Sequence, residues 1–229
     1  MNATALLALL QSSDSTYPTG AYAHSFGLEG FVEAGLVRDV VSLEALLAEH
    51  LLPALAYAEL PYVRLAHAAA AAQDLDLVCA LDEECAALRG ARELREAGSR
   101  IGAQRVALAA ELMPSAWNAQ LQRAHDEGRW RGQLPVAYGA LCAGCGARAE
   151  DAVAAYTYQQ LAGAIAAAMK LLRLGQRAAQ GVLTRLLAAS IPWQERSAAI
   201  PRDEAGWFTP GLDIASARHE TAYTRLFIS

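Results

Sequence analysis

Residues 150–189 read EDAVAAYTYQQLAGAIAAAMKLLRLGQRAAQGVLTRLLAA. Alanine and leucine dominate this stretch, and both are strong helix formers. The pattern predicts either one very long helix or two helices joined near Gly175. We expect it to end at Ile191-Pro192, because a proline removes a helical hydrogen bond and usually closes the run. A helical stretch of this length already favours a helical fold for the whole protein.

The composition of the whole chain has the same bias. Hydrophobic residues make up 54% of the 229 positions, whereas aromatic residues, which favour strands, make up only 7%. Alanine and leucine together exceed a third of the chain. This composition excludes disorder over most of the length, and a chain of this size can bury a core without disulfides or a metal. We therefore predict an all-α fold, a single helical-bundle domain of about ten helices.

Prolines, glycines and helix caps divide the chain into further helical stretches. Leucines recur on one helical face between residues 43 and 55. Pro53 and Pro61 are expected to kink this region or divide it into two antiparallel segments. Other helices are predicted at residues 3–11, 25–34, 58–72, 74–88, 92–112, 116–128 and 134–146.

The composition changes at Trp193. Prolines, glycines and acidic residues follow, and no helical pattern returns before Ser216. The last residues are apolar again, and apolar groups at a chain end fray unless they dock on the chain's own core or on a partner. We therefore predict a helical domain at residues 1–192, followed by an irregular segment and a partner-docking C-terminal tail at residues 193–229.

Charge and hydropathy exclude several classes of protein. The formal net charge is -5, whereas a general nucleic-acid binder carries a basic surplus. The most apolar stretch, residues 161–172, is shorter than the ~20 residues that a bilayer requires. The apolar start of the chain has neither a basic region before it nor a small-residue cleavage site after it. We predict a cytoplasmic protein that binds neither nucleic acid nor membrane.

Cys142 and Cys145 form the one CxxC motif of the chain. Three interpretations are open. The thiols can fill helix contacts as small apolar groups, they can bind a metal, or they can undergo redox chemistry. A closed zinc site needs two further ligands, and the sequence has no second CxxC and no HxxxH motif. We favour the structural interpretation and predict no bound metal and no cofactor.

Motifs typical of enzymes are missing from the sequence. It contains no GxSxG nucleophile elbow, no GxxxxGK[ST] phosphate loop and no GxGxxG after a strand. His24 and Ser25 are adjacent, and adjacent side chains point in different directions on most backbones. The sequence therefore predicts a scaffold or interaction protein and not an enzyme.

Three motifs carry a resemblance to a known family. Residues 10–29, LQSSDSTYPTGAYAHSFGLE, resemble the N-terminal signature of the UreF family of urease accessory proteins. Residues 218–229, RHETAYTRLFIS, are similar to that family's C-terminus, and Lys170 with the segment LGQRAAQ at 174–180 is similar to its central segment. The sequence departs from the family pattern at Arg173, where proline is common, and at Ala179, where glycine is common.

The resemblance implies an all-α homodimer that catalyses no reaction itself. It would bridge the UreD/UreH accessory protein and the GTPase UreG in the complex that delivers nickel to apo-urease. Alternatively, it would regulate the GTPase cycle of UreG, with Glu29, Lys170 and Arg225 contacting the GTPase and an arginine finger speeding hydrolysis. A weaker alternative is a nickel carrier that uses Cys142 and Cys145.

The resemblance also implies a set of partner-binding positions at the two ends of the chain and in the central segment. They are Tyr17, Pro18, Gly20, Tyr22, His24, Ser25, Phe26, Glu29, Lys170, Gln176, His219, Glu220, Tyr223, Arg225, Leu226 and Phe227.

Overall fold

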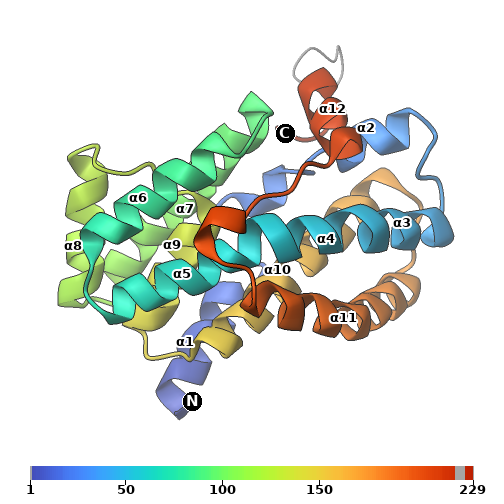
Figure 1. Ribbon diagram of the computed structural model, residues 1–229. Coiled ribbons are helices and arrows are strands. Elements are labelled where there is room, and N and C mark those ends of the chain that lie inside the picture. The colour runs from blue at the N-terminus through green and yellow to red at the C-terminus, as the bar shows by residue number, and fades with distance from the viewer. Residues whose placement is uncertain (1, 220–224, 229) are drawn as a thin grey trace.

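A computed structural model describes residues 2–219 and 225–228 of the chain. Within these residues there is no β-strand, and most of them lie in helices that pack as one bundle (Figure 1). When the continuous helix Val40–Ala71 is counted once, the described part contains about ten α-helices. The predicted all-α helical bundle is therefore confirmed.

The helical rod Val40–Ala71 runs through the centre of the molecule (Figure 1). Its parts are α3 (Val40–Leu46), a π-helical turn (Leu47–Leu51), α4 (Leu52–Ala54), a second π-helical turn (Leu55–Glu59) and α5 (Leu60–Ala71). The expected division into two antiparallel segments at Pro53 and Pro61 is wrong. Each proline lies two residues after the last residue of a π turn, whose wider hydrogen bonding accommodates the missing N–H without breaking the helix.

The carbonyl of Tyr57 is the group that Pro61 leaves without its usual donor in the rod. It accepts a hydrogen bond of 2.8 Å from the N–H of Gly206, which lies in the C-terminal part of the chain. The Trp207 ring stacks on the Tyr57 ring with centroids 4.8 Å apart. The rod is therefore the support to which the C-terminal segment is attached.

Close helix contacts build the first half of the core. The helices concerned are α6 (Leu75–Ala87), α7 (Arg92–Leu112), α8 (Ala116–Asp126) and α9 (Leu134–Gly144). Both α6 and α9 pack against α5, and α7 and α8 pack against α9. At Gly139 of α9, an added Cβ would lie 2.1 Å from the carbonyl oxygen of Val63 in α5. Only glycine allows the two backbones to approach this closely.

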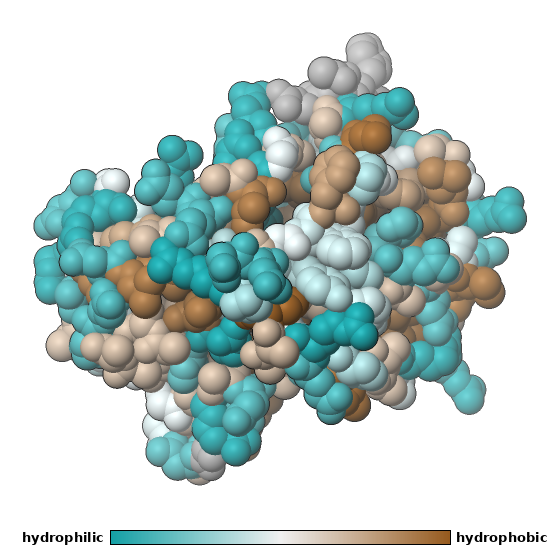
Figure 2. Space-filling view, in the orientation of Figure 1, coloured by the Kyte–Doolittle hydropathy of each residue, from teal (hydrophilic) through white to brown (hydrophobic). Residues whose placement is uncertain are grey.

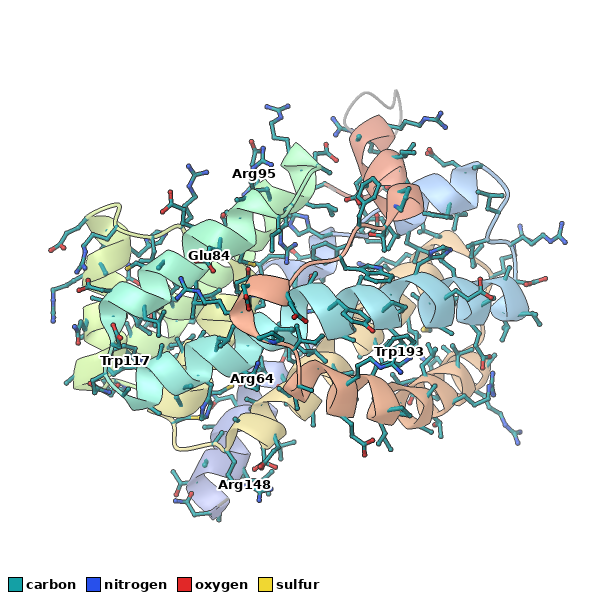
Figure 3. The ribbon with its side chains drawn as sticks, viewed as in Figure 1. Arg64, Glu84, Arg95, Trp117, Arg148 and Trp193 are labelled. Atoms are coloured by element: carbon teal, nitrogen blue, oxygen red, sulfur yellow. The ribbon has the colours of Figure 1, made fainter. Side chains whose placement is uncertain are left out.

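Two long helices, α10 (Ala149–Leu171) and α11 (Gln176–Ala198), build the second half of the core against the rod. They are joined around Gly175, which confirms the second of the two predicted arrangements. The predicted end at Ile191-Pro192 is wrong, because α11 continues through Pro192 to Ala198. Trp193, which is labelled in Figure 3, packs edge-on against a ring of the rod. This ring is that of Tyr57, and the two ring centroids are 6.3 Å apart. This packing offsets the hydrogen bond that the proline removes.

The remaining elements lie at the two ends of the chain. They are α1 (Ala3–Ser13), a 3-10 turn (Ala21–Ala23), α2 (Leu28–Glu33), a 3-10 turn (Arg202–Glu204) and α12 (Pro210–His219). The helix predicted at residues 25–34 is thus shorter than expected, and the segment after residue 192 is more helical than expected. At Gly30 of α2 an added Cβ would lie 3.3 Å from the Cβ of Ala215, so α2 and α12 lie side by side (Figure 1).

The rod is also long and apolar enough, by length and composition alone, to cross a membrane. This differs from the prediction that no segment has these properties. A core helix of a globular bundle meets the same criterion, and α9, α10 and α11 all pack against this rod. One such helix is therefore weak support for a membrane location. Figure 2 shows a surface that mixes hydrophilic and hydrophobic residues, with a hydrophobic group over α12.

Candidate functional site

The N-terminal signature forms a compact turn between α1 and α2. Gly20 and Gly27 have φ angles of 79° and 90°, which glycine adopts without steric cost. Phe26 has a φ of 52°, an unusual value for a bulky residue that persists only when the surroundings fix it. The His24 ring stacks on Phe26 with centroids 5.8 Å apart. The segment therefore has a defined shape.

Glu29 connects this signature to the other end of the chain. The residue is only 4% exposed, and a buried carboxylate is costly unless hydrogen bonds compensate it. Its two oxygens accept the backbone N–H groups of Leu226 at 2.7 Å and of Phe227 at 3.1 Å. The N–H of Ile228 also donates to the carbonyl of Ala23 at 2.8 Å. The end of the tail thus folds back on the chain's own N-terminal segment.

Lys170 of α10 joins the same cluster. Its Nζ donates to the carbonyl oxygen of Tyr22 at 3.0 Å. The same ammonium lies 5.4 Å from the ring centroid of Tyr22 and 5.2 Å from that of Phe227, within the range of cation–π attraction. The three motifs that are far apart in the sequence therefore meet at one place.

Phe227 requires a correction to the sequence-based expectation. We expected a tail whose apolar residues wait for a groove on a partner or on a second protomer. In the structure Phe227 is 5% exposed and belongs to the core formed with Leu28 and Ile165. The backbone bonds to Glu29 hold it there. Leu226, by contrast, is 62% exposed and available at the surface.

The other predicted site residues divide by exposure. Tyr17, His24, Ser25 and Glu29 are buried, Gly20 and Phe26 are half-buried, and Pro18, Tyr22, Lys170, Gln176, Arg225 and Leu226 are exposed. The backbone of His219 ends α12, whereas Glu220 and Tyr223 lie outside the described residues. Burial lowers the pKa of His24, and the positive charge of Arg100 lowers it further. The buried members shape the site, and the exposed members form its surface.

Two contacts of this site could not be found from the motifs. The guanidinium of Arg225 donates to the carboxylate of Glu93 at 3.0 Å, which ties the tail to α7. At Gly27 an added Cβ would lie 2.8 Å from the Oγ of Ser216 in α12. Gly27 of the signature and Gly30 just after it were the sequence signal for this close packing, since both face α12.

A cleft of about 790 Å³ adjoins the site. Its walls come from the N-terminal signature, the rod, α7 and α10, and both Tyr22 and Lys170 line it. Arg105 of α7 also lines it, and this arginine was not among the predicted residues. Its place in a charged run of α7 gave no signal that it is buried.

The bundle encloses Cys142, whereas Cys145 is half-buried. Cys142 is 4% exposed, and burial raises the pKa of its thiol far above the ordinary value. The thiol of Cys145 donates to the carbonyl oxygen of Cys142 at 3.2 Å. Among the described residues, His, Cys, Asp and Glu side chains form no group of three or more that could hold a metal ion. The described geometry fits the structural interpretation of these thiols.

Fold and site together define an all-α, single-domain protein in which a signature at the start of the chain, a lysine in its middle and a tail at its end build one surface. Comparison with known proteins identifies the family to which this protein belongs. The chain belongs to the UreF family of urease accessory proteins, whose family model matches residues 37–187.

Relatives extend the match to both ends of the chain. The chain is 38% identical to the urease accessory protein UreF of Azoarcus sp. (strain BH72), over 98% of this chain and 95% of the relative. It is 33% identical to the UreF of Paenarthrobacter aurescens (strain TC1), over 100% of both chains. It is 32% identical to the UreF of Actinobacillus pleuropneumoniae, over 97% of this chain and 98% of the relative. The alignment with the Paenarthrobacter aurescens relative spans the whole chain, so it includes the signature and the tail, which lie outside the family model's match.

Proposed function

We propose that this protein bridges a UreD/UreH-type accessory protein and a UreG-type GTPase during nickel insertion into apo-urease. It acts in the cytoplasm as a homodimer and supplies shape instead of catalysis. Nickel is the cargo of the complex and not a resident cofactor of this chain. The observation that carries the proposal is the meeting of the N-terminal signature, Lys170 and the C-terminal tail at one surface.

The arrangement of buried and exposed groups at this surface supports a docking role. Tyr22 is 73% exposed and Leu226 is 62% exposed, although both are next to well-anchored backbone. Tyrosine is enriched among the residues that dominate binding energy at protein interfaces. Anchored exposed groups lose little conformational entropy on binding, so they favour association. The buried Glu29 and Phe227 provide that anchoring.

Regulation of the GTPase remains the second candidate function. It requires a cation that can reach the phosphates of GTP, and Arg225 and Lys170 are the two candidates on this surface. Arg225 is held by Glu93 at 3.0 Å, so it must exchange that carboxylate for a phosphate before it can act as a finger. Lys170 is exposed but bonded to Tyr22. These bonds favour a scaffold function over the stimulation of GTP hydrolysis by an arginine finger.

A cysteine-based nickel carrier is the third candidate and has the least support. Nickel is bound by thiolates, which form only when the thiol loses its proton. Burial raises the pKa of both Cys142 and Cys145, and Cys142 has almost no exposed surface. The raised pKa values of both thiols and the burial of Cys142 disfavour a carrier function.

Co-purification tests the bridging function. The chain would be expressed with its two accessory partners, with and without GTP and Ni²⁺, and the complexes separated by size. Tyr22→Ala should weaken capture of the GTPase at least tenfold without lowering the melting temperature, because the side chain is exposed. Val41→Ala is the matched control, since Val41 is 76% exposed on α3. If Tyr22→Ala and Val41→Ala capture both partners as the unchanged chain does, the signature is not a docking surface.

A further inference from the structure

The walls of the 790 Å³ cleft are mainly apolar. Leucines of α1 and of the rod, together with alanines of α10, contribute to this apolar lining. The volume lies within the roughly 300–1,000 Å³ that is typical of small-molecule sites, which combine apolar walls with a few polar groups. The apolar lining residues include Leu9, Leu47, Leu51, Ala155, Ala162 and Ala166.

Arg105 is the unusual polar group of this cleft. It is 2% exposed, and no carboxylate among the described residues lies within ion-pairing distance of it. Its Nη1 donates to the carbonyl of Ser12 at 2.7 Å and its Nη2 donates to Gln159 Oε1 at 3.0 Å. Both acceptors are neutral, and the Nε has no partner. A buried charge is costly when no opposite charge compensates it.

A second arginine of the cleft, the half-buried Arg89, shows the contrast. Arg89 donates to the Glu59 carboxylate at 3.0 Å, and the hydroxyl of Tyr156 donates to the other oxygen of Glu59 at 2.6 Å. That arginine is therefore neutralised within the chain. Tyrosine rings lie near Arg105 instead, with centroids 5.5 Å away for Tyr17 and 4.9 Å away for Tyr138. They attract a cation but do not supply a negative charge.

Gly163 of α10 leaves one wall of the cleft open. A glycine inside a helix costs roughly 0.5–1 kcal/mol relative to alanine. At Gly139 a close backbone contact explains the glycine, but a Cβ added at Gly163 would meet no atom within 4 Å. Packing inside the described chain therefore does not require this glycine. The open space at Gly163 faces the same cleft as Arg105.

We propose that the cleft binds an apolar molecule that carries a single carboxylate, such as a medium-chain fatty acid. The guanidinium of Arg105 meets the carboxylate, because three of its five N–H groups have no acceptor among the described residues. A planar guanidinium matches a carboxylate better than an ammonium does. The leucine and alanine walls cover the hydrocarbon chain, which passes Gly163. This proposal does not depend on the bridging function.

Calorimetric titration with three probes tests the site on the full-length chain. Decanoate carries both the apolar chain and the charge, decanol carries only the chain, and acetate carries only the charge. Decanoate should bind at least tenfold more tightly than either of the other two. Binding of decanol as tight as that of decanoate would contradict the role of Arg105. Absence of decanoate binding would overturn the site.

Two glycine variants distinguish an effect on the cleft from an effect on the fold. Gly163→Leu should fill the cleft and weaken decanoate binding at least tenfold, while circular dichroism shows unchanged helicity. Gly181→Leu is the control, because Gly181 also lies inside a long helix, α11, but does not line the cleft. Equal decanoate binding by Gly163→Leu and the unchanged chain would overturn the proposal, even if Arg105→Gln failed to fold. Assembly of the urease accessory complex is measured separately and reports on the bridging function alone.

Discussion

The α5–α9 contact and the joined chain ends are held together in different ways. Between α5 and α9, Gly139 and Val63 bring two backbones into direct contact over a fully buried surface. At the chain ends, one buried carboxylate, one lysine and one aromatic ring hold the tail, and neighbouring side chains stay exposed. The difference indicates that the helical core determines global stability, whereas the end surface can open with the core intact.

The largest expected effect is on the α5–α9 contact. Gly139→Val should destabilise the protein by about 3 kcal/mol or more, because its Cβ would lie 2.1 Å from the Val63 carbonyl and force the helices apart. Denaturant unfolding followed by circular dichroism measures the change. Unaltered unfolding would show that the two helices do not approach as closely as described.

A smaller and local effect is expected at the chain ends. Glu29→Ala leaves the N–H groups of Leu226 and Phe227 without an acceptor, which costs roughly 1–3 kcal/mol for the attachment of the tail. Hydrogen exchange of these two amides should become faster, whereas amides of α5 and α9 keep their protection. Equal acceleration in α9 would mean that the ends and the core unfold together, contrary to the comparison above.

The smallest expected effect is a pH dependence of stability that arises from His24 in the N-terminal signature. Burial and Arg100 lower the pKa of His24 below its usual value of 6.5, so the folded chain favours the neutral imidazole. The unfolded chain binds more protons once the pH falls below about 6.5, and stability that is present above this pH is lost as the pH falls toward the folded pKa. The drop in melting temperature between pH 7.5 and pH 5.5 should shrink in His24→Gln. An identical drop in both proteins would assign the pH dependence to other groups.

The sequence predicted the helices better than their junctions. Alanine and leucine periodicity was sufficient for α7, α10 and the start of α11, because helix formation there depends on local composition. Local rules predict a kink or a division at Pro53 and Pro61 and a helix end at Pro192. In the structure, π turns precede the first two prolines, Trp193 packs on Tyr57 beside the third, and the helix continues through all three. Rules based on local sequence include the hydrogen bond that a proline removes. They do not include the tertiary contacts of Tyr57 and Trp193 that offset its loss.

The site was predictable only in part, for a similar physical reason. The motifs identified Glu29, Lys170 and Phe227 as related positions, but the spacing between them carries no distance information. That Phe227 is buried and Tyr22 exposed follows from how the tail folds back, which depends on the carboxylate of Glu29. Arg105 could not be found at all, because its burial results from the packing of α1, α7 and α10.

The hydrogen bond between Gly206 and the Tyr57 carbonyl has a consequence for the order in which the chain assembles. This acceptor exists in its observed position only after residues 55–61 have become helical with Pro61 in place. The C-terminal segment can therefore attach only to a rod that is already formed. During synthesis on the ribosome, the rod emerges well before Gly206 does. We therefore expect the C-terminal segment to attach after the rod has formed.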